Sequence, residues 1–102
     1  MNELHALCSL GDVGYDRGAT SYMTYVYLIV SESNPKQRYA GVTDNLEQRI
    51  IDHNAGRSSH TSKYIPWQLI TYVAISDKEK AVAFERYFKS GSGHAFANKR
   101  LW

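Results

Sequence analysis

The chain has 102 residues, which suits one domain with a single core and leaves no room for a second. Its 43% apolar and 22% charged residues are ordinary for a soluble protein, and no apolar run is long enough to span a membrane. The single cysteine, Cys8, cannot form an internal disulfide, and no N-terminal segment resembles a secretion signal, so we expect a cytoplasmic protein.

The net charge of +2 conceals an asymmetry along the chain. Residues 1–53 carry four Lys or Arg against seven Asp or Glu, whereas residues 54–102 carry eight against three. The segments 54–76 and 86–102 contain no acidic residue. Such a distribution suits a phosphate backbone as partner, although charge alone favours a solvated basic face at least as strongly.

The first predicted elements form a β-hairpin that follows an N-terminal extension, residues 1–21. Residues 24–31 are rich in β-branched and aromatic side chains and predict a strand, with both faces apolar and therefore covered. A turn near Ser33 leads to a returning strand over residues 38–42. If the hairpin is symmetric about Ser33, Tyr27 lies opposite Tyr39 on one face of the sheet.

A helix follows the hairpin. Asp44 with Glu47 three residues later predicts its N-cap, and the helix should run to about Asn54. Half of its inward stripe is polar, since Arg49 and His53 alternate there with apolar residues at helical spacing.

The second half of the chain predicts a strand and two helices. Residues 67–75 are again apolar and β-branched, which indicates a third strand. Ser76 and Glu79 form a capping box for a helix over about residues 77–89, with Glu85 inside its apolar stripe. The glycine-containing segment 90–93 should break this helix before a last one over 94–101. The order β-β-α-β-α-α predicts a small α+β fold.

Five polar side chains are placed toward the core or its edge: Tyr27, Tyr39, Arg49, His53 and Glu85. Because a buried charge needs a partner, one interpretation is an ion pair between Arg49 and Glu85 with His53 merely hydrogen-bonded. The other is a cleft for phosphate chemistry. There Arg49 would neutralise a phosphate, Glu85 would hold a cation such as Mg²⁺, and a tyrosine or histidine would move a proton. Patterning leaves both open.

These residues resemble the signature of the GIY-YIG nucleases. Tyr25-Val26-Tyr27 and Tyr39-Ala40-Gly41 match its two parts, and Arg49 and His53 lie ten and fourteen residues after Tyr39, as in that family. Glu85 matches the metal-binding glutamate of the second helix. The likeness covers about residues 22–102 and is greatest to small stand-alone bacterial members, which are related to the N-terminal nuclease domain of the excinuclease UvrC.

The resemblance implies a three-stranded antiparallel sheet flanked by helices over residues 22–102, and hydrolysis of DNA phosphodiesters with one Mg²⁺ or Mn²⁺ ion. Tyr27 or Tyr39 would orient or deprotonate water with help from His53, Arg49 would stabilise the phosphate, and Glu85 would bind the metal. Candidate DNA-binding residues are Arg57, Lys63, Lys89, Asn98, Lys99 and Arg100.

The expected function is therefore that of an endonuclease or nickase with weak sequence specificity, acting in DNA repair or recombination. We expect no membrane partner and no small-molecule cofactor, and a homodimer is compatible with the sequence. The alternatives are a non-catalytic nucleic-acid-binding module of the same fold and a structural protein recruited by a partner.

Overall fold

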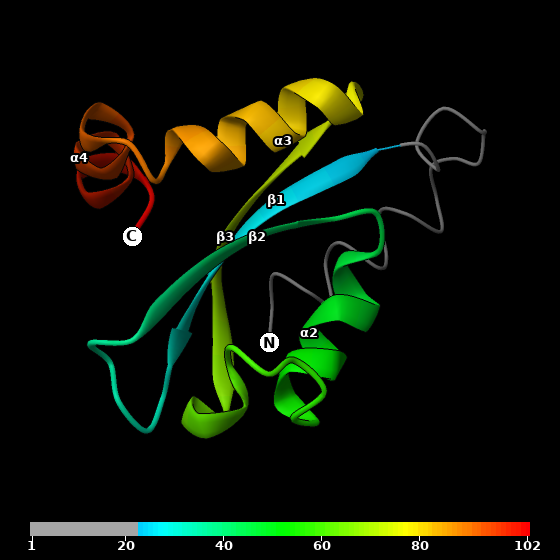
Figure 1. Cartoon of the computed structure of the whole chain (residues 1–102), viewed down its shortest axis with the longest axis vertical. Helices are drawn as coiled ribbons and strands as arrows, with labels where there is room; N and C mark the ends of the chain where they lie inside the picture. Colours follow the sequence, from blue (N-terminus) through cyan, green and yellow to red (C-terminus); the bar gives the residue numbers. More distant parts are fainter. Residues whose placement is uncertain (1–22) are drawn as a thin grey trace.

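A computed structural model describes residues 23–102, so the N-terminal extension and Cys8 lie outside the described part of the chain. The described residues form the expected α+β fold, a three-stranded antiparallel sheet with strand order β2-β1-β3 and helices around it (Figure 1). Within them no helix is long and apolar enough to cross a membrane. The elements are β1 Thr24–Ser31, β2 Arg38–Thr43, α2 Leu46–Asn54, the short 3-10 helix η2 Ser62–Tyr64, β3 Trp67–Ile75, α3 Lys78–Tyr87 and α4 Gly91–Arg100.

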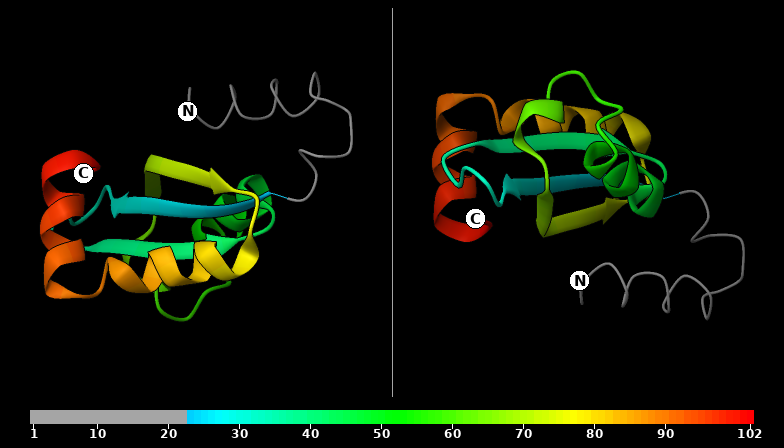
Figure 2. Two further views of the ribbon diagram at one scale, coloured as in Figure 1. Left: turned by 90° about the horizontal axis from the view of Figure 1, so that it is seen from above. Right: turned by 90° about the horizontal axis from the view of Figure 1, so that it is seen from below.

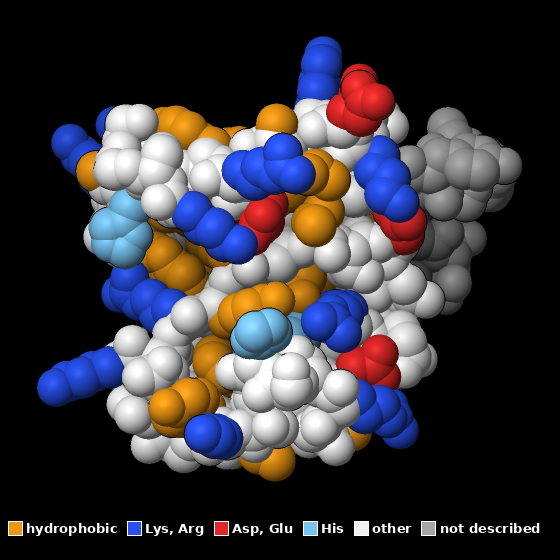
Figure 3. Space-filling view, viewed as in Figure 1, with side chains coloured by type: hydrophobic (Ala, Val, Ile, Leu, Met, Phe, Trp, Pro, Cys, Tyr) orange, Lys and Arg blue, Asp and Glu red, His pale blue; other side chains and the backbone are white. Residues whose placement is uncertain are grey.

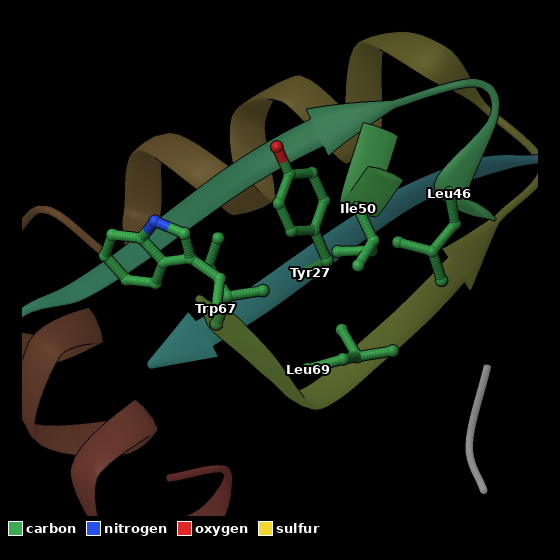
Figure 4. Close-up of a cluster of buried hydrophobic side chains, with 6 residues drawn as sticks. Tyr27, Leu46, Ile50, Trp67 and Leu69 are labelled. Atoms are coloured by element: carbon green, nitrogen blue, oxygen red, sulfur yellow. The ribbon is translucent and has the colours of Figure 1, made fainter. Parts of the chain in front are cut away.

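The central strand β1 is covered on both faces, as its two apolar faces predicted. Alternate residues of β1 point to opposite sides of the sheet. Figure 2 shows α3 in front of the sheet from above and α2 in front of it from below. On the α2 side the buried core consists of Tyr27, Ile29, Leu46, Ile50, Trp67 and Leu69 (Figure 4). On the α3 side it consists of Val26, Leu28, Ala81, Phe88 and Ala97.

The predicted register of the hairpin is wrong by two residues. Tyr27 pairs with Gly41, and Ile29 pairs with Tyr39. The turn closes around Asn34, whose N–H donates to the Ser31 hydroxyl at 3.0 Å and whose carbonyl accepts from Gln37 at 2.8 Å. A shift of two residues preserves the face of every side chain, so Tyr27 and Tyr39 still share the α2 side.

The N-caps of α2 and α3 lie one residue later than predicted. Asn45 caps α2 by accepting from the Gln48 N–H at 3.1 Å. Asp44 is not the cap because its carboxylate is engaged elsewhere, accepting from the Thr24 hydroxyl at 2.9 Å. Asp77, rather than Ser76, caps α3.

Helix α4 begins at Gly91, within the glycine-containing segment, and not at His94 as predicted. Ser90 is the N-cap and accepts from the Gly93 N–H at 3.2 Å. A Cβ at position 93 would overlap the carbonyl oxygen of Tyr87. The glycine therefore allows the first turn of α4 to lie directly against the end of α3.

Candidate active site at the edge of the sheet

The Tyr27 side chain crosses the edge strand of the sheet. Tyr27 is buried in β1, and its ring lies across Gly41 of β2. Any Cβ at position 41 would overlap the tyrosine ring and hydroxyl. Gly41 therefore lets the tyrosine hydroxyl reach the free edge of β2, between the α2 and α3 sides of the molecule (Figure 4).

Two side chains of α2 meet this hydroxyl. The Arg49 Nε donates to the Tyr27 oxygen at 3.2 Å, and the His53 Nε2 lies 2.8 Å from the same oxygen. Arg49 and His53 stand one turn apart on the inward side of α2, as their spacing predicted. The structure thus joins three of the predicted site residues through a single oxygen atom.

Thr61 completes this network and was missed by the sequence reasoning. Its buried hydroxyl lies 2.7 Å from His53 Nδ1 and 3.5 Å from the Ser58 carbonyl oxygen. A carbonyl only accepts, so we infer that Thr61 donates to Ser58 and accepts from the Nδ1–H of His53. His53 Nε2 is then the unprotonated nitrogen and accepts from the Tyr27 hydroxyl.

Tyr39 packs beside this network. Its ring centroid lies 6.4 Å from that of Tyr27 and 5.3 Å from that of His53, the latter in a T-shaped arrangement. Tyr39 is half-buried, whereas Tyr27 and His53 are fully buried. Both tyrosine rings meet the His53 ring in the T-shaped arrangement that aromatic pairs prefer.

Glu85 approaches from α3 and is 8% exposed. The ion pair between Arg49 and Glu85, one of the two interpretations that the sequence left open, does not form. Glu85 Oε2 lies 3.0 Å from Lys89 Nζ, and Arg49 donates to Tyr27 instead. Lys89 follows one turn later in the chain, just beyond the end of α3, and its exposed ammonium reaches back over that turn. The negative charge of Glu85 contributes, as the smallest of the causes, to raising the pKa of Tyr27. Helix α3, which carries Glu85, packs against β1 and β2.

The oxygen donor of Glu85 fits a hard cation held by one protein ligand. Among residues 23–102, no three His, Cys, Asp or Glu side chains are grouped so that they could hold a metal ion. A single carboxylate with water and phosphate oxygens is a usual way for proteins to hold Mg²⁺.

Burial and the adjacent guanidinium set the charge states of the network. Burial raises the pKa of Tyr27 to about 12, although Arg49 opposes this by favouring the tyrosinate. Burial also lowers the pKa of His53 to about 4, and the positive charge of Arg49 acts in the same direction. At neutral pH the tyrosine is therefore a phenol and the histidine is a neutral base.

The remaining candidate DNA-binding residues lie just after α2, in η2 and in α4. Arg57 Nη1 pairs with Asp52 at 2.7 Å, just after α2. Arg38 Nη1 donates to the Asn98 amide oxygen at 2.7 Å, which joins β2 to α4. The exposed Lys63 lies in η2, and the exposed Lys99 and Arg100 end α4. Lys and Arg side chains are spread over the face that carries the β2 edge, around a hollow lined by hydrophobic side chains (Figure 3).

The topology and the polar centre at the sheet edge are those of a nuclease-like α+β domain. The GIY-YIG catalytic domain matches residues 23–99, and the chain belongs to this family.

Two relatives share a substantial part of the chain. A UPF0213 protein of Streptococcus pyogenes serotype M5 is 36% identical over 64 residues, which cover 62% of this chain and 70% of the relative. A UPF0213 protein of Lacticaseibacillus paracasei is 33% identical over 75 residues, 72% of this chain and 80% of the relative. No solved structure matches the chain with significant similarity.

Replacing Gly41 by Ala should displace the Tyr27 ring from the sheet edge. The added methyl group overlaps the ring, whose hydroxyl is held by Arg49 and His53. Overpacking of this kind costs about 1–3 kcal/mol, and urea unfolding would measure it. Gly91→Ala is the matched control, because no heavy atom lies within 4 Å of the added Cβ there. Equal unfolding free energies for the two variants would contradict this placement of Tyr27.

The buried His53 should make the protein less stable in mild acid. Its folded pKa of about 4 lies below the ordinary value of 6.5. Between these values the unfolded chain binds a proton that the folded chain does not. The stabilisation that depends on neutral His53 is therefore fully present above about pH 6.5. The free energy of unfolding falls by about 1–3 kcal/mol as the pH drops toward 4. Urea unfolding at successive pH values measures this loss.

Two variants isolate the contribution of His53 to this pH dependence. In His53→Gln the loss of unfolding free energy between about pH 6.5 and pH 4 should be much smaller than in the wild type. In His60→Gln, a change at an exposed position, the loss should be as large as in the wild type. Asp44 and Asp52 have pKa values lowered by hydrogen bonds from Thr24 and Arg57, so their contributions disappear only below about pH 4. An unchanged pH dependence in His53→Gln would contradict the assignment.

Proposed function

We propose that this protein is a divalent-metal-dependent endonuclease or nickase that hydrolyses DNA phosphodiesters with weak sequence specificity. The observation that carries the proposal is the Tyr27 oxygen, which contacts both Arg49 Nε and His53 Nε2 beside Gly41 of the edge strand. A base, a phenol and a guanidinium thus meet at one oxygen atom, and the buried Glu85 of α3 would add a carboxylate. These groups suit phosphoryl chemistry.

Arg49 supplies positive charge for the phosphate. Its Nε donates to Tyr27, and its terminal nitrogens would donate to phosphate oxygens. A planar guanidinium with several donors matches the extra negative charge that develops on these oxygens during attack. Because the hydrogen bond to Tyr27 fixes the orientation of Arg49, little side-chain freedom is lost when the phosphate arrives.

Tyr27 and His53 supply a route for the proton of the attacking water. The tyrosine oxygen takes this proton while its own proton passes to the neutral His53 Nε2, whose Nδ1–H is held by Thr61. The oxygen of the water then forms the new bond to phosphorus as the bond to the leaving oxygen breaks. Tyr27 is favoured over Tyr39 for this role because Tyr27 bonds to both the base and the guanidinium.

Glu85 would hold one Mg²⁺ or Mn²⁺ ion through its carboxylate. When bound, such an ion polarises the phosphate and lowers the pKa of water. Lys89 Nζ lies 3.0 Å from the same carboxylate. We expect Lys89 to move toward a DNA phosphate when the ion binds, because its side chain is 69% exposed and its surface ion pair is weak.

Contacts to the DNA backbone would come from the basic residues around the site. Lys63, Arg57, Lys89, Lys99 and Arg100 provide charge, and Asn98 provides an amide next to Arg38. Contacts of this kind position a strand without reading its sequence. Membership of the GIY-YIG family supports a DNA substrate, and a role in DNA repair or recombination is part of this proposal.

A second candidate is a nucleic-acid-binding module that keeps the fold and does not cleave. The ion pair between Lys89 and Glu85 favours it, because the ammonium stands where a catalytic cation would be held. Binding of DNA that weakens with salt and yields no product with any divalent ion would support this second function.

The test is an assay of the purified protein on end-labelled single-stranded, duplex, flapped and branched DNA. We expect cleavage of at least one of these structures with Mg²⁺ or Mn²⁺. Products at many positions would agree with weak sequence specificity. Absence of product on every structure with both ions would contradict the proposed activity.

A further inference from the structure

A cavity of about 260 Å³ lies next to the candidate active site, on the α3 side of the β2 edge. Its walls are largely apolar, with Leu28, Ala40 and Phe88 among them. An apolar cavity of about 150 Å³ can accommodate a benzene molecule, so this cavity has room for a larger planar ring system. Its size and lining therefore fit a nucleobase.

Two lining residues connect the cavity to the candidate active site. Tyr39 lines it, and the Tyr39 ring also packs against His53. Lys89 lines it as well, and the Lys89 ammonium contacts Glu85. A ligand group in the cavity would therefore lie close to a phosphate held at Arg49 and Glu85.

The charges around the cavity suit the base of a nucleotide, whose phosphate groups are negatively charged. Arg38, Lys89 and His94 line it, and none of the described residues that line it is acidic. The guanidinium of Arg38 lies 4.6 Å from the centroid of the Trp102 ring and donates to Asn98. These contacts hold the Trp102 ring and the Arg38 guanidinium in place at the wall of the cavity. Sites that bind single-stranded nucleic acid likewise combine aromatic rings, on which bases stack, with cations along the phosphate backbone.

We propose that this cavity binds an unpaired nucleobase adjacent to the phosphate that is cleaved, so that the substrate is single-stranded or locally unpaired DNA. The proposal rests on the proposed nuclease function and specifies its substrate. A base within a duplex is stacked on both sides and paired at its edge. Only a base turned out of the stack can enter an apolar cavity of this size.

The first test uses the wild-type protein and changes only the DNA. An end-labelled single strand with one abasic residue is cleaved with Mg²⁺ or Mn²⁺, and the product ladder is compared with that of the unmodified strand. We expect cleavage to fall about tenfold at one bond, at a fixed offset from the abasic residue, because stacking of one base is lost. The other bonds of the same strand serve as the internal control.

The second test measures binding without cleavage. Glu85→Gln is titrated with a short oligonucleotide and with its counterpart that has the same phosphates and no bases. We expect about tenfold weaker binding of the counterpart, and we expect this difference to disappear when Trp102→Ala is added. Trp102→Phe should retain most of the difference, since it keeps an aromatic ring.

The outcomes separate this proposal from the proposed function. A uniform ladder on abasic DNA, or better cleavage of intact duplex, would overturn the cavity assignment and leave the nuclease function standing. Base-dependent binding that Trp102→Ala removes, with no cleavage by the wild type, would support the cavity and overturn the nuclease function. Absence of both binding and cleavage would overturn both.

Discussion

Glu85→Gln is expected to reduce DNA cleavage by about 10³-fold or more while leaving the protein folded. The amide keeps the shape of the side chain and removes the negative charge that would hold a cation. Glu85 is nearly buried, and its one ion pair among the described residues is to an exposed lysine. Breaking that pair costs about 1 kcal/mol or less, so the melting temperature should change little.

The matched control for this prediction is Glu79→Gln. Glu79 lies on α3 as well but is exposed in the first turn, away from the buried face of that helix. Single-turnover cleavage with Mg²⁺ and thermal unfolding are measured for both variants. If Glu85→Gln cleaved DNA at the wild-type rate, Glu85 would have no role in metal binding.

Tyr27→Phe is expected to reduce the cleavage rate by about 10²–10⁴-fold, because the route from the attacking water to His53 loses its central oxygen. The same change removes the partner of the buried His53 Nε2 and of Arg49 Nε. Leaving a buried nitrogen without a partner costs about 1–3 kcal/mol, so we also expect a lower free energy of unfolding.

Tyr25→Phe is the control for the loss of a hydroxyl. Tyr25 lies two residues earlier on the same face of β1, where its ring contacts Tyr72 at a centroid distance of 6.2 Å. Cleavage rates should be compared at a temperature where urea unfolding shows every variant fully folded. A Tyr27→Phe variant as active as Tyr25→Phe would exclude the tyrosine hydroxyl from proton transfer.

The arrangement of the elements could be predicted because each strand and helix has a clear hydrophobic pattern. The two apolar faces of residues 24–31 predicted a strand that is covered on both faces, and β1 has helices on both sides. The position of β1 between β2 and β3 was not predicted. The register of the hairpin could not be predicted, because it depends on hydrogen bonds within the turn between Ser31 and Asn34. Alternation alone fixes the face of a residue and not its partner.

The candidate site could be predicted in part. The helical spacing of Arg49 and His53 predicted that both would lie on the inward side of α2. Thr61 could not be identified, since it belongs to a loop that has several hydroxyl residues and no periodicity. The ion pair of Glu85 with Lys89 was not considered, although Lys89 lies four residues later and the spacing alone indicates this pair.

The central claim is that Glu85 holds a cation with which Tyr27, His53 and Arg49 cleave DNA. The most direct measurement follows strand cleavage by the purified wild-type protein during one reaction with Mg²⁺, then with excess chelator, then with Mg²⁺ restored. We predict that cleavage starts with the ion, stops with the chelator and resumes when the ion is restored. Cleavage that continues unchanged in the chelator would contradict the claim.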